Sequence, residues 1–121
     1  MPVLVVDDDD AIRAVVAAAL AFELGVRVFW ARDGAHALAR VGALGPPALV
    51  VTDLRMPVLD GYGLIRALRS ASATARVPIV GISAAGEEQR ALAAGCDAFL
   101  AKPFDVDELV RVVRRLLETE R

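Results

Sequence analysis

Five short apolar runs, separated by segments with helical periodicity, restrict the fold of this chain more than any other feature. The runs are continuous and do not alternate with polar residues, which is typical of strands covered on both faces of a sheet. The segments between them repeat apolar residues at helical spacing. The pattern predicts an α/β fold in which strand and helix alternate five times. The predicted strands are Val3 to Val6, Val26 to Phe29, Ala48 to Thr52, Pro78 to Ile82 and Ala98 to Ala101.

The short connections between these elements predict a parallel sheet built from right-handed crossovers. Five such units favour a flavodoxin-like, three-layer (βα)5 sandwich with strand order 2-1-3-4-5. Asp33, Asp60 and Asp105 mark the starts of helices. Asp105 and Glu108, three residues apart, resemble a capping box with an acidic cap. We expect residues 1–121 to form one domain, because the chain is long enough for a single core only.

Composition excludes several functional classes. A net charge of −2 provides no basic field for a nucleic-acid backbone, so direct nucleic-acid binding is not expected. The single cysteine, Cys96, cannot form an internal disulfide and is predicted to be an inert core residue. No apolar run reaches the roughly 20 residues of a membrane helix, and the chain enters its first strand without a signal sequence. A cytoplasmic location is therefore expected.

Polar residues follow four of the five predicted strands. The run Asp7 to Asp10 follows the first strand, Asp53 the third, Ser83 the fourth and Lys102 the fifth. In an open parallel sheet, ligands bind beyond the carboxyl ends of the strands where the strand order reverses, here between the first and third strands. The second strand, which ends near Trp30, is predicted at the sheet edge. The sequence thus predicts a polar site at the switch point.

The chemistry of that site follows from its charges. Two carboxylates about 4 Å apart repel by roughly 4 kcal/mol at an effective dielectric of 20, so a cation is expected among them. Lys102 supplies one charge, and carboxylate oxygens suit a hydrated Mg²⁺ or Mn²⁺. With these cations neutralising a phosphoryl group and Ser83 donating a hydrogen bond, Asp53 can act as a nucleophile that forms an aspartyl phosphate.

Four segments resemble the signature of two-component response-regulator receiver domains, of the chemotaxis-regulator kind. They are V-L-V-V-D-D at 3 to 8, V-V-T-D-L-R-M-P-V-L-D-G at 50 to 61, G-I-S-A at 81 to 84 and A-F-L-A-K-P-F at 98 to 104. The resemblance covers essentially the whole chain, and the set is specific in content and order.

The resemblance implies a role for each acidic residue of the predicted site. Asp53 would be the phosphoacceptor and a metal ligand. Asp8 would bind Mg²⁺ directly, Asp7 directly or through water, and the backbone carbonyl of Arg55 would complete the protein ligands.

The resemblance also implies a switch. Lys102, followed by what is commonly a cis bond to Pro103, would hold the phosphoryl group. Ser83 and Phe99 would be the switch pair, the hydroxyl moving toward the phosphate and the ring turning inward. The signal would reach the face made by the fourth helix, fifth strand and fifth helix.

Partners follow from the same resemblance. A histidine kinase or histidine phosphotransfer protein would donate the phosphoryl group, and a downstream protein or a fused output domain would respond. The chain would be a signalling switch and no enzyme beyond its own phosphotransfer and autodephosphorylation. Its ends fit both a stand-alone regulator and a domain cut from a longer protein.

Other polar residues have simpler interpretations. Asp9 or Asp10 is predicted to cap the first helix. His36 is expected on a helix surface, and we assign it no role. Trp30 is expected to pack at the sheet edge.

Two departures from the family pattern affect the switch. Ser83 and Lys102 are 19 positions apart, about one turn of 3.6 residues fewer than is usual in the family. The fourth helix is thereby limited to Glu87 to Ala94, and we expect it to be mobile or displaced. The second departure is Arg55, which together with Ala85 flanks the predicted site. We expect Arg55 to lean over the phosphoryl group or to pair with Asp8 or a neighbouring acid.

Three other protein classes share features with this sequence. A haloacid-dehalogenase-like phosphatase also forms an aspartyl phosphate, but its D-x-D motif continues with x and Thr or Val, whereas the acidic run here is followed by Ala11. A flavodoxin needs phosphate-binding donors where this chain has aspartates. A pseudo-receiver, which keeps the fold without being phosphorylated, stays open.

Overall fold

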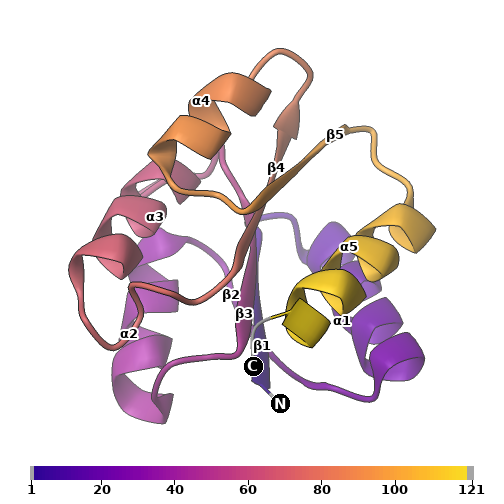
Figure 1. The fold of residues 1–121 in the computed structure, drawn as a ribbon, viewed down its shortest axis with the longest axis horizontal. Helices are drawn as coiled ribbons and strands as arrows, with labels where there is room; N and C mark the ends of the chain where they lie inside the picture. The colour runs from indigo at the N-terminus through magenta and orange to yellow at the C-terminus, as the bar shows by residue number, and fades with distance from the viewer. Residues whose placement is uncertain (1, 120–121) are drawn as a thin grey trace.

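The computed structural model describes residues 2–119 and contains five strands and five helices in strict alternation (Figure 1). The predicted order of elements is confirmed. The strands are β1 (Pro2–Val6), β2 (Arg27–Ala31), β3 (Leu49–Asp53), β4 (Ile79–Ala84) and β5 (Ala98–Lys102). The helices are α1 (Asp10–Leu24), α2 (Gly34–Leu44), α3 (Gly61–Ser70), α4 (Glu88–Ala94) and α5 (Val106–Thr119).

All five strands are parallel and lie in the order β2-β1-β3-β4-β5, as predicted. Helices α2, α3 and α4 cover one face of the sheet and α1 and α5 the other, which gives the three-layer sandwich (Figure 1). Successive strand residues therefore enter two different cores. Leu4 and Val50 pack toward the first group of helices, and Val3 and Val51 toward the second. Burial on both faces explains why the strands are apolar without alternation.

Some strand ends differ from the prediction. β2 continues beyond Phe29 to Ala31, because Trp30 and Ala31 pair with the last two residues of β1. β4 likewise continues to Ala84, which pairs with Lys102. Hydrogen bonding to a neighbouring strand, and not hydrophobicity, sets these ends. Asp53 and Lys102 are likewise the last residues of β3 and β5, and Ser83 is the last but one of β4, instead of following these strands.

The predicted helix starts are confirmed where the structure shows side-chain caps. The carboxylates of Asp9, Asp33 and Asp60 accept backbone N–H groups at the starts of α1, α2 and α3. Asp105 accepts the N–H of Asp107 before α5, at 2.8 Å. A cap of this kind stabilises a helix by about 1 kcal/mol relative to alanine.

Gly61 allows α3 to begin directly against the end of β3. A Cβ atom at this position would lie 2.4 Å from the carbonyl oxygen of Asp53 and 2.7 Å from Cα of Leu54. The backbone N–H of Gly61 instead donates to the Leu54 carbonyl at 3.1 Å. This close approach fixes the loop between Asp53 and α3, which contains Arg55.

Helix α4 is short, as predicted, with seven residues from Glu88 to Ala94. It packs against α3 and β5, and its N-cap residue Glu87 makes no side-chain cap to the helix backbone. Within residues 2–119, none of the helices combines the length and the hydropathy needed to cross a membrane.

Candidate functional site

Three aspartates come together at the carboxyl ends of β1 and β3. Asp7 and Asp8 follow β1, and Asp53 ends the adjacent strand β3. One carboxylate oxygen from each lies within 4.8 Å of the others. Asp7 and Asp53 are only 5% and 4% exposed, whereas Asp8 is exposed. The predicted cluster is therefore present, with an open side toward solvent at Asp8.

Lys102 completes the group from β5. Its Nζ lies 3.2 Å from Oδ2 of Asp53, although β4 separates their strands in the sheet. The backbone N–H of Arg55 reaches the other oxygen, Oδ1, at 3.4 Å. The Lys102–Pro103 peptide bond is cis, as the family resemblance implied. The structure thus holds the Asp53 carboxylate between a cation and a backbone donor.

The electrostatics of the cluster favour a bound cation. Burial raises the pKa of Asp7 above its ordinary value of 3.8, and the nearby carboxylate of Asp53 raises it further. The N–H of Asp9 donates to Asp7 Oδ1 at 2.9 Å and opposes that shift only in part. One lysine cannot balance three carboxylates. A hard divalent cation with oxygen ligands suits this donor set.

Ser83 is buried, with 3% exposure, but its hydroxyl points to a different partner. Its Oγ donates to Oε2 of Glu87 at 2.7 Å. In the described part of the chain Ser83 makes no side-chain hydrogen bond to Asp53 or Lys102. Phe99, the other predicted switch residue, is half-buried against the core beneath α3 and α4.

Glu87 is a residue of this region that the sequence analysis missed. Besides Ser83, its carboxylate accepts the Tyr62 hydroxyl at 2.7 Å and forms an ion pair with Arg55 at 2.9 Å. These donors lower the pKa of Glu87 to about 2, the serine and tyrosine hydrogen bonds contributing most. Burial, followed by the bond to Glu87, raises the pKa of Tyr62 to about 12. The sequence alone marks Glu87 only as the first residue of the short fourth helix.

Arg55 makes one of the contacts predicted for it, an ion pair with a neighbouring acid. Its guanidinium pairs with a neighbouring acid, Glu87, and not with Asp8. It also lies 5.7 Å from the centroid of the Tyr62 ring.

The rest of the acidic run serves α1. Asp9 is the N-cap, and Asp10 pairs with Arg13 at 2.8 Å. Arg13 also donates to the Asp7 carbonyl at 3.1 Å and lies 4.3 Å from the centre of the Trp30 ring. Trp30 is 43% exposed on the edge strand and contacts His36 edge-on.

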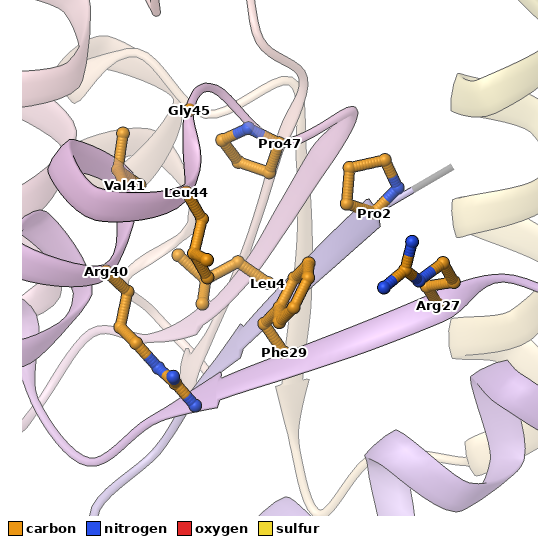
Figure 2. Close-up of a pocket in the computed structure, with 9 residues that line it drawn as sticks. All are labelled: Pro2, Leu4, Arg27, Phe29, Arg40, Val41, Leu44, Gly45 and Pro47. Carbon is orange, nitrogen blue, oxygen red and sulfur yellow. The ribbon is translucent and has the colours of Figure 1, made fainter.

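A surface groove lies near the opposite end of the sheet (Figure 2). Leu4, Phe29 and Leu44 lie between the sheet and α2, and Arg27 and Arg40 stand at the margins. The residues that line this groove contribute no carboxylate or hydroxyl side chain.

Comparison with known proteins agrees with this geometry. Residues 3–114 match the family described as response regulator receiver domain. The response regulator MprA of Mycobacterium avium (strain 104) is 41% identical over 120 residues, which cover 97% of this chain and 51% of MprA. This chain therefore spans about half the length of that relative.

Solved structures show the same fold. The Francisella response regulator 1452 receiver domain aligns with a TM-score of 0.90 and 32% identity over 99% of this chain and 98% of its own. The receiver domain of the sensor histidine kinase PA1611 from Pseudomonas aeruginosa PAO1 aligns with a TM-score of 0.81 and 34% identity, covering 97% of both chains. That structure has a magnesium ion coordinated in its active-site cleft.

Proposed function

Because the chain belongs to the response regulator receiver domain family of two-component systems, we propose that Asp53 is the side chain on which it accepts a phosphoryl group. The observation that carries this proposal is the surrounding of the Asp53 carboxylate. It is 4% exposed, bonded to Lys102 at 3.2 Å and within reach of two further aspartates.

The proposed reaction is an in-line phosphoryl transfer. A carboxylate oxygen of Asp53 forms a bond to phosphorus while the P–N bond of a donor phosphohistidine breaks. The bonding electrons stay with the histidine nitrogen, which then takes up a proton. Lys102 neutralises the developing negative charge on the phosphoryl oxygens, and its contact with Asp53 supports this role.

A divalent cation fits the acidic cluster. Asp7, Asp8 and Asp53, with the backbone carbonyl of Arg55, are the proposed ligands of Mg²⁺ or Mn²⁺. The bound metal would supply charge neutralisation between the carboxylates and the phosphoryl oxygens. The raised pKa of Asp7, caused first by burial and then by the carboxylate of Asp53, supports this assignment, because a bound cation would stabilise the charged form of Asp7.

Ser83 and Phe99 are the proposed switch residues. After transfer, the Ser83 hydroxyl would donate to a phosphoryl oxygen, and Phe99 would turn inward. The half-buried position of Phe99 beside α4 supports this role. The responding surface would be formed by α4, β5 and α5.

The wider setting is proposed on the same basis. Residues 1–121 form one receiver domain, a switch that catalyses only its own phosphotransfer and autodephosphorylation. The donor is a histidine kinase or a histidine phosphotransfer protein, and the responder is a downstream protein or a fused output domain. The proposed location is the cytoplasm.

Incubation with acetyl phosphate and Mg²⁺, followed by intact-mass measurement, tests the proposal. A single phosphate adduct is expected in the wild-type protein and none in Asp53→Asn. Absence of an adduct in the wild-type protein with any small phosphodonor or phosphohistidine donor would favour a pseudo-receiver.

A further inference from the structure

Two buried hydroxyl groups converge on one carboxylate at the start of α4. Ser83 on β4 and Tyr62 on α3 are 3% and 2% exposed, and each donates to Glu87 at 2.7 Å. Arg55 covers the same carboxylate from the solvent side at 2.9 Å. One glutamate therefore joins the β4 end, α3 and the loop after β3.

The Ser83 hydroxyl has a single proton to donate. While that proton is donated to Glu87, it cannot be donated to a phosphoryl oxygen on Asp53. A hydrogen bond to an ionised carboxylate is roughly twice as strong as one between neutral groups, so Glu87 is a strong competitor. Arg55 and Tyr62 keep the carboxylate in place for this bond.

We propose that Glu87 is a positioning residue that holds the Ser83 hydroxyl away from Asp53 and thereby slows phosphorylation. The inference rests on the proposed function, because it assigns Ser83 to the phosphoryl group. A phosphoryl group carries about −1.5 to −2 charges and is itself a strong acceptor. Phosphorylation therefore requires Ser83 to exchange one anionic partner for another, at the start of the helix that belongs to the proposed output surface.

The first test removes the charge of Glu87. Glu87→Gln keeps the size and one acceptor oxygen but offers only a neutral hydrogen bond to Ser83. The rate of adduct formation with acetyl phosphate and Mg²⁺ is expected to rise about threefold or more, the effect of losing a charge-assisted bond. Glu88→Gln is the matched control, because Glu88 is exposed, adjacent and of the same charge, and it should leave the rate unchanged.

The second test asks whether the gain depends on Ser83. In a Ser83→Ala background, Glu87→Gln should give no gain, whereas loosening of α4 alone would give the same gain in both backgrounds. Tyr62→Phe removes one of the bonds that keep the Glu87 carboxylate in place but leaves its charge and its bond to Ser83, so a gain smaller than that of Glu87→Gln is expected. If Glu87→Gln lowers the melting temperature, Glu87→Asp keeps the charge with a shorter reach, and the same Ser83-dependent gain is expected.

The outcomes separate the two proposals. Absence of an adduct in the wild-type protein overturns the function proposed for Asp53. An adduct that forms equally fast in the wild-type protein and Glu87→Gln, or a gain that persists without Ser83, overturns only the role of Glu87.

Discussion

Two groups of side chains at the carboxyl ends of the strands differ in their contacts. In the first group, called the prepared side, Lys102 already contacts Asp53, and carboxylate oxygens of Asp7 and Asp8 lie nearby. In the second group, called the response side and formed by the end of β4 and the start of α4, the Ser83 hydroxyl is bonded to Glu87 instead. The charges needed for the proposed phosphoryl transfer are assembled in advance, while Ser83, the residue proposed to respond to the transfer, is bonded elsewhere. This difference separates the chemistry of the domain from its response.

Replacing Asp53 should have the largest effect, because it removes the proposed phosphoacceptor. Asp53→Asn keeps the shape but removes the nucleophilic carboxylate, so complete loss of the phosphate adduct is expected by intact mass. Asp9→Asn is the control, because Asn caps a helix as well as Asp does. An adduct of equal yield in Asp53→Asn would move the acceptor to another residue.

Replacing Asp8, the exposed member of the proposed ligand set, should weaken metal binding. Asp8→Asn is expected to lower Mg²⁺ affinity by at least about tenfold, the scale on which even outer-shell partners of metal ligands act. Calorimetric titration measures the effect. Asp10→Asn removes one charge from the same loop outside the cluster and should have little influence. Equal affinities in the two variants would contradict the proposed ligand set.

The response side should also be the less stable one. Helix α4 has seven residues and no side-chain cap, whereas α1 has 15 residues and is capped by Asp9. We expect its backbone amides to exchange hydrogen at least about tenfold faster than those of α1, corresponding to about 1.4 kcal/mol in opening free energy. Exchange as slow as in α1 would show that the bonds of Glu87 hold α4 firmly.

A smaller effect concerns the stability of the metal-free protein. The folded-state pKa of Asp7 is raised, so the folded chain binds its proton more tightly than the unfolded chain. This contribution stabilises the fold at low pH and is lost as the pH rises through the folded-state pKa. At neutral pH without metal, Asp7→Asn should therefore raise the unfolding free energy, by on the order of 1 kcal/mol.

The pH dependence distinguishes this cause from others. The gain in Asp7→Asn should shrink as the pH approaches 3.8, the ordinary pKa of the carboxyl group, and Mg²⁺ should stabilise the variant less than the wild-type protein. Urea denaturation at several pH values measures both effects. A gain that is independent of pH would exclude the titration of Asp7 as its source.

The smallest effect is expected at Arg55, which joins the two sides. Its exposed guanidinium pairs with Glu87, and we predict that Arg55→Ala admits water to the phosphoryl group and shortens the lifetime of the phosphorylated state about threefold, within the range of an exposed ion pair. Phosphate release measures the lifetime. Arg66→Ala, an exposed substitution on α3, serves as the control, and an unchanged rate in Arg55→Ala would remove the idea.

The sequence predicts the sheet and the prepared side well for the same reason. Strands buried on both faces leave a readable apolar pattern, and parallel strands bring their carboxyl ends to one edge. Asp7, Asp53 and Lys102 could thus be placed together from strand order alone. The ends of β2 and β4 were less accurate, because pairing between strands sets them and single-strand hydrophobicity does not record it.

The role of Glu87 could not be predicted in this way. Its bond to Tyr62 joins residues 25 positions apart and depends on how α3 packs against α4. In the sequence, nothing distinguishes Glu87 from any other polar residue at the start of a helix. Local patterns identify which residues face a core, but they do not identify which buried hydroxyl meets which carboxylate.

Trp30 lies where its fluorescence could report on the acidic cluster. It is the only tryptophan in the chain, and the Arg13 side chain that contacts its ring also donates to the carbonyl of Asp7. A shift of the loop after β1 when the acidic cluster is filled would move that guanidinium relative to the indole. Indole emission should therefore follow cation binding in real time, without any dye or label attached to the protein.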